Sequence, residues 1–307
     1  MKILFMGTPD IAAKCLNTLI EKKMNVVGAV SQPDKPKGRG HKLAPTDVKI
    51  AASEANIPVF QPERIKSGEL LPILEELKPD IIAVVAYGKI LPKYVLDYPK
   101  YGCVNMHASL LPKLRGAAPV QWAVINGDSE TGVTTMLMDE GLDTGDILLS
   151  QKLEIGEYET AEELFSRIAD TGGKLLAETI LDIENITPKK QAQEGATYAP
   201  MLTKEMGHIN WLQSTDKISK FICGMNSWPL AYSLYKGEVV KIIRAQKGEA
   251  EKGENGQILG FEKGKGIKVK TSDGSIYIKE LQFAGSKRMS ADDYLRGHSI
   301  EIGTILN

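Results

Sequence analysis

The sequence predicts an α/β protein with two domains. The first is a doubly wound, mostly parallel sheet of the Rossmann-like kind, and the second is a small β-barrel resembling the OB type. Short apolar runs alternate with helix-like segments through the first half of the chain. One run, residues 81–87, is continuously apolar, which is typical of a strand buried on both faces of a sheet. Beyond about residue 204, short strand-like segments dominate.

The amino-terminal half begins with an expected strand, Ile3–Met6. Thr8, Pro9 and Asp10 then supply an N-cap, a proline at the first helical position and an acid in the first turn, so a helix is predicted to about Lys23. Thr160 and Glu163 form a capping box that predicts a second long helix. Further strands are expected at 26–30, 81–87, 103–107 and 133–138, and helices at 67–77 and from the capping box to about 181.

The carboxy-terminal part is separated from the first half by a polar segment, residues 184–203, which contains Pro188 and Pro200. We interpret this segment as an interdomain linker between domains 1–183 and 204–307. A hairpin turn is predicted at 272–274. One helix (215–223) and five short strands (231–235, 239–245, 256–259, 267–271 and 275–281) are expected in the second domain.

Composition excludes several classes of protein. The 307 residues are 42% hydrophobic and 25% charged, values that exclude disordered and collagen-like chains. The apolar run 81–87 is too short to cross a bilayer. Three widely spaced cysteines form neither a disulfide framework nor a metal-ligating motif, so no metal is expected. The amino terminus becomes polar too soon for a signal peptide, and we therefore expect a cytoplasmic protein.

Charge is distributed unevenly along the chain. The formal net charge of -1 would by itself argue against a nucleic-acid partner. However, residues 203–307 carry 16 Lys and Arg against 12 Asp and Glu, whereas residues 1–202 carry 22 against 27. A basic carboxy-terminal domain thus follows an acidic amino-terminal one, which permits local binding of a nucleic acid while the acidic part repels bulk RNA.

The stretch from Asn105 to Pro112 is the richest in chemistry. It begins in a predicted parallel strand, and ligands of open α/β sheets bind beyond the carboxyl ends of such strands. Strand alternation places Asn105 and His107 on the same side. A second polar cluster, residues 139–146, follows the strand at 133–138 and contains Asp143. We expect the two clusters to face one cleft.

An amide, an imidazole and a carboxylate suit the attack of an amine on a carbonyl carbon. His107 could accept the proton that the amine loses, and the Asn105 amide could stabilise the oxyanion. Asp143 could orient His107 or share the proton. Taken alone, His107 and Asn105 are more often structural, as strand-end hydrogen-bonding groups, and Asp143 could cap a loop; their joint position at two strand ends favours the catalytic interpretation. No G-x-S-x-G elbow surrounds Ser109, so we expect its hydroxyl to bond to the backbone.

The segment 32–49 is unusually long for a connection between a strand and a helix. Its composition alone favours a solvated loop. A functional alternative is an arm that binds phosphate groups beside the site. Two glycines flank its arginine and would leave the arginine side chain free to contact a ligand. Its basic residues, set against Asp34 and Asp47, are Lys35, Lys37, Arg39, Lys42 and Lys49.

The chain resembles the methionyl-tRNA formyltransferases over essentially its whole length. Asn105-Met106-His107-Ala108-Ser109-Leu110-Leu111-Pro112 is the segment shared with formyltetrahydrofolate-using enzymes in general. The basic loop and the carboxy-terminal domain narrow the resemblance to the tRNA enzymes. Other matching segments are 5–10, 86–92, 115–119, 139–146 and 197–200.

The resemblance implies transfer of a formyl group from N10-formyltetrahydrofolate to the amino group of methionyl-initiator tRNA, by a monomer. It makes Asn105, His107 and Asp143 the catalytic set. The basic loop, with Lys35, Lys37, Arg39 and Lys42, would guide the acceptor end, and the second domain would hold the tRNA body. The folate would contact Ala86, Tyr87, Gly88, Ile90, Ser109, Leu110, Leu111, Pro112, Asp139, Gly141 and Leu142.

Two positions depart from the family pattern. Cys223 stands where the resemblance predicts an arginine, and Ser227 stands where a proline is usual. The first departure removes one possible tRNA contact. Two other functions remain open: an amino-sugar nucleotide formyltransferase of the same superfamily, and a folate- or RNA-binding module without catalysis. The intact catalytic set argues against the binding module.

Overall fold

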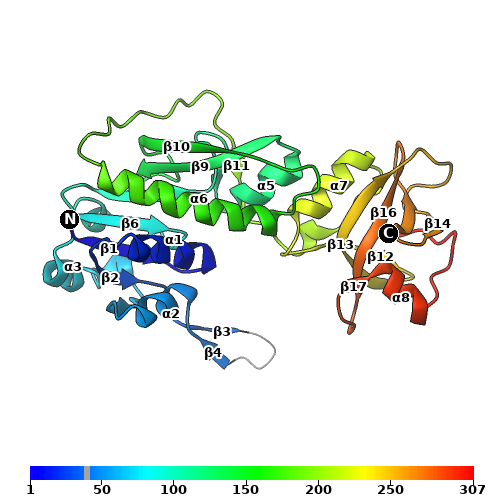
Figure 1. The fold of residues 1–307 in the computed structure, drawn as a ribbon, viewed down its shortest axis with the longest axis horizontal. Helices are drawn as coiled ribbons and strands as arrows, with labels where there is room; N and C mark the ends of the chain where they lie inside the picture. Colours follow the sequence, from blue (N-terminus) through cyan, green and yellow to red (C-terminus); the bar gives the residue numbers. More distant parts are fainter. Residues whose placement is uncertain (38–41) are drawn as a thin grey trace. The chain divides into compact units, whose positions relative to one another are not determined.

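A computed structural model describes residues 1–37 and 42–307 (Figure 1). Its contacts divide the chain into two compact units, each made of separate segments. The first contains residues 1–116, 131–153 and 165–199, and the second contains 117–130, 154–164 and 200–307. The second unit therefore includes two segments that precede residue 184, and the boundaries at 183 and 204 stay a prediction.

The first unit is built on a seven-stranded sheet of order β10-β9-β7-β6-β1-β2-β5. The pairs β5–β2, β2–β1, β1–β6 and β6–β7 are parallel, which confirms the mostly parallel sheet. The pair β7–β9 is antiparallel. The strands are β1 (Ile3–Gly7), β2 (Val26–Val30), β5 (Val59–Phe60), β6 (Ile81–Val85), β7 (Cys103–His107), β9 (Glu130–Leu137) and β10 (Ile147–Glu154).

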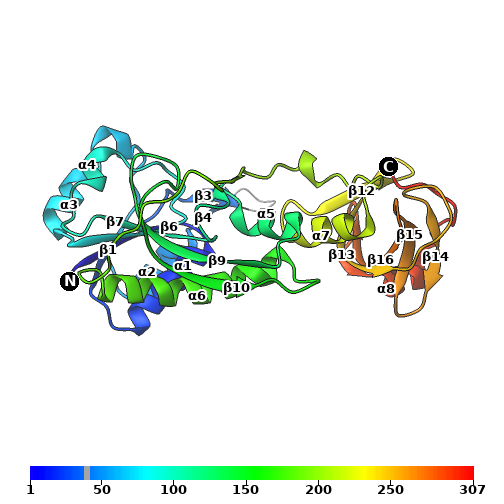
Figure 2. The ribbon, with the colours of Figure 1, turned by 90° about the horizontal axis from the view of Figure 1, so that it is seen from above.

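Helices cover both faces of this sheet (Figure 2). On one face, α1 (Asp10–Glu21) and α6 (Ala161–Leu181) pack closely, because Gly173 lets the two backbones approach. On the other face, α3 (Leu71–Leu77) and α4 (Lys93–Leu96) bury Leu74 and Val95 against Leu4 and Met6. The doubly wound arrangement is thereby confirmed, since alternate side chains of β1 serve the two layers.

The predicted capping box is present at the start of α6. The Thr160 hydroxyl accepts a hydrogen bond from the Glu163 amide at 3.2 Å, and the Glu163 carboxylate accepts one from the Thr160 amide at 2.9 Å. The same carboxylate pairs with Arg244 at 2.6 Å, and both residues belong to the second unit. Partial burial alone would raise the pKa of Glu163, but hydrogen bonds from Thr160 and Arg244 outweigh it and lower that pKa to about 2.

We expect Glu163→Gln to lower the stability of the protein at neutral pH and to leave its stability in acid nearly unchanged. A carboxylate with a lowered pKa stabilises the fold above its unfolded pKa, and that contribution disappears as the pH falls through its folded pKa. The loss in the wild type therefore falls between about pH 4.5 and pH 2. Glu163 is 46% exposed, so the effect is modest. Chemical unfolding at a series of pH values measures this effect. Between pH 4.5 and pH 2 the free energy of unfolding should change less with pH in the variant than in the wild type. Equal changes in the two proteins would contradict the lowered pKa of Glu163.

The second unit contains the antiparallel sheet predicted for the carboxy-terminal part. Its strand order is β12-β13-β16-β15-β14, with β17 paired to β16. The turn predicted at 272–274 joins β15 to β16, and its Asp273 carboxylate accepts hydrogen bonds from the amide and the hydroxyl of Thr215, at the start of the preceding helix. The strands are β12 (Ala231–Tyr235), β13 (Glu238–Gly248), β14 (Ile258–Glu262), β15 (Gly266–Lys270), β16 (Ser275–Phe283) and β17 (Met289–Ser290).

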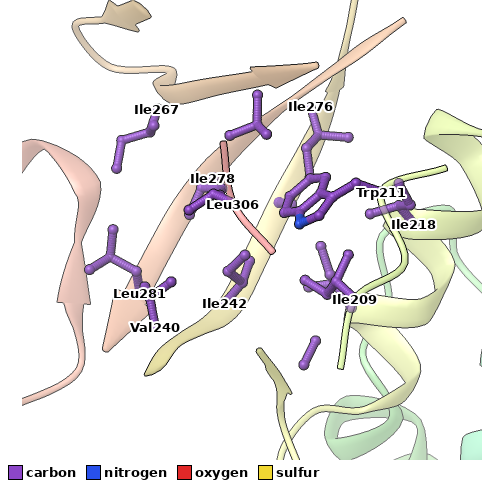
Figure 3. Close-up of a cluster of buried hydrophobic side chains, with 14 of the residues drawn as sticks. Ile209, Trp211, Ile218, Val240, Ile242, Ile267, Ile276, Ile278, Leu281 and Leu306 are labelled. Carbon is purple, nitrogen blue, oxygen red and sulfur yellow. The ribbon is translucent and has the colours of Figure 1, made fainter. Parts of the chain in front are cut away.

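The core of the second unit lies between this sheet and the segment that precedes α7 (Thr215–Gly224) (Figure 3). Trp211 is 5% exposed, and its indole nitrogen donates to the Ser233 hydroxyl at 2.9 Å. Isoleucines from the strands fill the space around the indole, including Ile242, Ile276 and Ile278. Helices α5 (Pro119–Asn126) and α8 (Ala291–Gly297) complete the unit.

Cys223 packs inside the second unit. It is 4% exposed, and its thiol lies 3.7 Å from the Tyr158 carbonyl oxygen, to which it donates. Burial raises the pKa of this thiol. The position that the resemblance assigns to an arginine is thus a packing position in this chain.

None of the helices in the described residues has the length and apolar character needed to cross a membrane.

Candidate active site

Strand β7 carries two of the predicted catalytic side chains. All five residues of the strand are buried, and Asn105 and His107 are 9% and 6% exposed. Because side chains alternate along a strand, both lie on the same face of the sheet. Within the described part of the chain, the Asn105 carboxamide forms no hydrogen bond to another residue, so its amide hydrogens are available.

Asp143 reaches His107 by a route that the sequence did not predict. Strand β9 runs antiparallel to β7, and Leu137 at its end lies opposite Val104, three residues before His107. The loop after β9 therefore starts beside the beginning of β7 and folds back. It nevertheless brings an Asp143 carboxylate oxygen to 3.6 Å from His107 Nδ1. The expected meeting of the two clusters is confirmed, although the carboxyl ends of these strands do not share an edge.

Glycines at two places allow this loop and its partner to approach. A Cβ at Gly145 would lie 1.7 Å from the Leu137 carbonyl oxygen. Gly116 has φ +115°, and a Cβ there would lie 2.8 Å from the Ala199 carbonyl oxygen. The Gly116 amide donates to the Asp143 carboxylate at 2.8 Å, which fixes that carboxylate beside the imidazole. No side chain larger than hydrogen fits at either position without moving backbone.

The hydrogen bond on the far side of His107 defines its tautomer. Nε2 lies 3.0 Å from the Leu114 carbonyl oxygen. A carbonyl oxygen can only accept, so Nε2 carries a hydrogen and donates it. In the neutral imidazole, Nδ1 is then the basic nitrogen. The basic nitrogen is therefore the one that lies beside Asp143.

The segment 86–90 leaves the sheet directly after β6. Ala86 has φ +43° and Gly88 has φ +82°, a left-handed path that ends the strand two residues earlier than the apolar run predicted. The Tyr87 side chain is buried, whereas Ile90 is 67% exposed. Exposed residues on either side of the buried Tyr87 make this segment suited to contact with a planar ligand.

Gln32 was not predicted as a site residue, yet it holds this segment. Its side-chain nitrogen donates to the Tyr87 carbonyl oxygen at 2.8 Å, and its side-chain oxygen accepts from Lys35 at 3.2 Å. A Cβ at Gly88 would lie 2.5 Å from that same nitrogen. Gln32 thus links the base of the basic loop to the backbone of segment 86–90.

The residues after His107 mainly build the turn. The Ser109 hydroxyl donates to the Lys113 carbonyl oxygen at 2.6 Å, as expected for a backbone-bonding residue. The Leu111 amide donates to the Thr134 hydroxyl at 3.2 Å, and Thr134 in turn donates to the Ser109 carbonyl oxygen. Leu110 and Pro112 are half-buried. These bonds tie the turn to β9 and fix the direction in which His107 projects.

The loop 139–142 is organised by Asp139. Its carboxylate accepts hydrogen bonds from the Thr144 hydroxyl at 2.7 Å and from the Gly141 amide at 3.0 Å. A Cβ at Gly141 would lie 2.0 Å from the Thr144 hydroxyl oxygen. Leu142 is 57% exposed. The structure thus engages Asp139 within its own loop and leaves Leu142 exposed at the surface.

The basic segment 32–49 is partly a hairpin. Strands β3 (Lys35–Lys37) and β4 (Lys42–Ala44) pair antiparallel, and Thr46 caps α2 (Asp47–Glu54). Lys49 forms an ion pair with Asp34 at 2.6 Å, and hydrogen bonds from Gln61 and Lys49 lower the pKa of Asp34. Lys49 is therefore engaged in the fold. Arg39 lies outside the described residues.

Two family descriptions match this chain. The formyl transferase family matches residues 1–180, and the carboxy-terminal domain of formyl transferases matches residues 201–299. A methionyl-tRNA formyltransferase of Alkaliphilus oremlandii is 49% identical over 309 residues, covering all of this chain and 99% of the relative. The methionyl-tRNA formyltransferase of Clostridium acetobutylicum is also 49% identical, with the same coverage.

Solved structures with the same fold are more distant in sequence. HypX from Aquifex aeolicus in complex with tetrahydrofolic acid superimposes with a TM-score of 0.66 at 17% identity, covering 99% of this chain and 50% of HypX. An N-formyltransferase from Helicobacter canadensis, bound to folinic acid and dTDP-3-aminofucose, superimposes with a TM-score of 0.67 at 20% identity, covering 94% and 100%. These likenesses concern the fold, whereas the full-length relatives share nearly half of the sequence. The chain belongs to the methionyl-tRNA formyltransferase family.

Proposed function

We propose that this enzyme transfers the formyl group of N10-formyltetrahydrofolate to the amino group of methionyl-initiator tRNA, with Asn105, His107 and Asp143 as its catalytic residues. The observation that carries the proposal is the 3.6 Å approach of the Asp143 carboxylate to the buried His107, with the Asn105 side chain on the same face of β7. The full-length identity to methionyl-tRNA formyltransferases supports the choice of acceptor.

His107 acts as the general base. The attacking amine loses a proton as the tetrahedral intermediate forms, and Nδ1 of His107 accepts it. The imidazolium that results is stabilised on both sides, because Nδ1 faces the Asp143 carboxylate and Nε2 donates to the Leu114 carbonyl oxygen. The pair would return this proton to the nitrogen of the leaving folate.

Asn105 stabilises the oxyanion. The donor supplies the formyl carbon, whose oxygen becomes negatively charged when the amine adds. An amide N–H that is held in place and shielded from water stabilises this charge more than water does, because little reorganisation accompanies the step. Asn105 is 9% exposed and not engaged elsewhere among the described residues, which suits this role.

We expect the folate to lie against segment 86–90 and the loop before Asp143. The exposed Ala86, Gly88 and Ile90 and the exposed Gly141 and Leu142 would provide backbone and apolar contacts. Residues 109–112 would border the same site from β7, and Tyr87 and Asp139 would support it from within the fold. The exposed residues proposed to contact the folate are all uncharged, which suits a planar heterocycle.

We expect the tRNA to contact the basic loop and the second unit. Lys35 lies at the start of the hairpin and contacts Gln32, so the loop is joined to the segment proposed for folate. The acceptor end of the tRNA would be guided by the basic residues Lys37, Arg39 and Lys42. We infer a monomer that acts in the cytoplasm, where its tRNA substrate is found.

A single assay tests the proposed function. The enzyme is supplied with N10-formyltetrahydrofolate and either methionyl-initiator tRNA or an amino-sugar nucleotide, and the formylated product is identified. Formylation of the tRNA alone is expected. Formylation of the sugar nucleotide alone would identify the protein as an amino-sugar nucleotide formyltransferase. Tight binding of tRNA or folate without any turnover would identify it as a binding module without catalysis.

Arg39→Ala is expected to weaken transfer to tRNA and to lower its sensitivity to salt. Removing one phosphate contact should reduce the slope of log(kcat/KM) against log[salt] by about 0.7–0.9. Lys22→Ala, which removes an exposed charge at the end of α1, is the matched control and should leave the slope unchanged. Equal slopes for Arg39→Ala and the wild type would identify the segment as a solvated loop.

A further inference from the structure

The segment 189–199 forms backbone pairs near both residues of the catalytic pair, His107 and Asp143. It belongs to the first unit, although the sequence suggested only a linker. Lys189 pairs with Ile147 at the end of the Asp143 loop. Tyr198–Ala199 (β11) pairs with Arg115–Gly116 (β8). The segment therefore pairs with backbone that follows Asp143 and with backbone that follows His107.

Arg115 is the largest fully buried side chain in the described residues, at 1% exposed. Its guanidinium donates from Nε at 3.1 Å and from Nη2 at 2.8 Å to a single acceptor, the side-chain oxygen of Gln191. Arginine can only donate, so it requires the oxygen of the Gln191 amide to point toward it. The amide nitrogen of Gln191 must then point the other way.

The Gln191 nitrogen donates to the catalytic loop. Its two nearest acceptors are the Asp143 carbonyl oxygen at 2.9 Å and the Gly145 carbonyl oxygen at 2.7 Å, and the Met136 sulfur lies farther away at 3.9 Å. Both amide hydrogens are thus used on the backbone that carries Asp143. Asp143 itself has φ +53°, a conformation that a non-glycine residue keeps only when its surroundings hold it there.

We propose that Gln191 is a positioning residue, oriented by Arg115, which holds the backbone of Asp143 so that its carboxylate meets His107. The proposal rests on the catalytic roles given under the proposed function. A second set of bonds supports it from the histidine side. Thr197 accepts from the Leu114 amide through its hydroxyl at 2.9 Å, and Leu114 accepts the His107 hydrogen bond. One segment thereby fixes the partner of each imidazole nitrogen.

Gln191→Glu tests this proposal. The glutamate keeps the size of the side chain and gives Arg115 an anionic acceptor, but an ionised carboxylate cannot donate to the two carbonyl oxygens. We expect kcat for formyl transfer to fall on the order of 10²-fold, because a small displacement of a catalytic group has such an effect. The KM for methionyl-tRNA should stay unchanged. Gln193→Glu, the same change at an exposed neighbour, should keep the wild-type kcat.

A double variant shows whether Gln191 acts through Asp143. Asp143→Asn combined with Gln191→Glu should be no slower than Asp143→Asn alone. Wild-type kcat in Gln191→Glu, a change confined to KM, or multiplicative losses in the double variant would each overturn the proposal. Inactivity of the wild type toward methionyl-tRNA would instead count against the proposed function. Should Gln191→Glu fail to fold, Gln191→Asn, which is too short to bridge both partners, carries the same expectation.

Discussion

Replacing His107 with alanine is expected to lower kcat for formyl transfer by about 10²–10⁴-fold. The variant lacks the only imidazole beside Asp143 in the described part of the chain, so the attacking amine has no positioned acceptor for its proton. Initial rates with saturating methionyl-tRNA and N10-formyltetrahydrofolate measure the effect. Binding of tRNA should be retained, because the basic loop and the second unit are unchanged.

Asp143→Asn should produce a loss of the same kind. The asparagine side-chain oxygen can still accept the hydrogen bond that the Gly116 amide gives to Asp143, so the loop keeps this contact. The variant loses the negative charge that stabilises the imidazolium. His107→Ala and Asp143→Asn together should be no slower than the slower single variant, because residues that act as a unit are not additive. Wild-type turnover in both single variants would remove the catalytic assignment.

Much of this fold could be predicted because its signals are local. The apolar run at 81–85 lies in the middle of the sheet, and the capping box of Thr160 and Glu163 forms as its spacing indicates. The alternation of Asn105 and His107 along β7 follows from the geometry of a strand alone. These features depend on residues within about one turn or one strand of each other.

The direction of β9 was not available from the sequence. An alternating βα pattern favours parallel neighbours, but β9 joins the sheet antiparallel after α5, so its carboxyl end lies beside the start of β7. The prediction that Asp143 approaches His107 was confirmed although its reasoning assumed a shared edge. The loop 139–146 closes the distance, with Gly145 at a position where any side chain would overlap the Leu137 carbonyl.

Supporting residues were missed for a related reason. Gln32 and Gln191 lie among other polar residues in connecting segments, and nothing in their neighbourhood in the sequence distinguishes them. Their partners are 55 and 76 positions away, at Tyr87 and Arg115. Arg115 belongs to a segment that resembles the family, but its burial and its single acceptor could be recognised only in the folded chain. Long-range hydrogen bonds of this kind leave no periodic pattern.

Asn105→Ala is expected to lower kcat by about 10²–10³-fold, the usual effect of removing one donor from an oxyanion site. The substitution removes an amide that forms no hydrogen bond among the described residues, so it disturbs few native contacts. The interaction exists only when charge has developed on the formyl oxygen. The loss should therefore appear in kcat, with the KM values for both substrates nearly unchanged.

Two variants make this prediction specific. Asn17→Ala removes an exposed asparagine from α1 and should keep the wild-type kcat. Asn105→Asp keeps the shape of the side chain but places a carboxylate where the oxyanion forms, so it should be at least as slow as Asn105→Ala. Thermal unfolding of each variant shows whether the fold is intact. An active Asn105→Asp enzyme would assign the oxyanion to other donors, and a rise in KM without a change in kcat would make Asn105 a binding residue for the ground state.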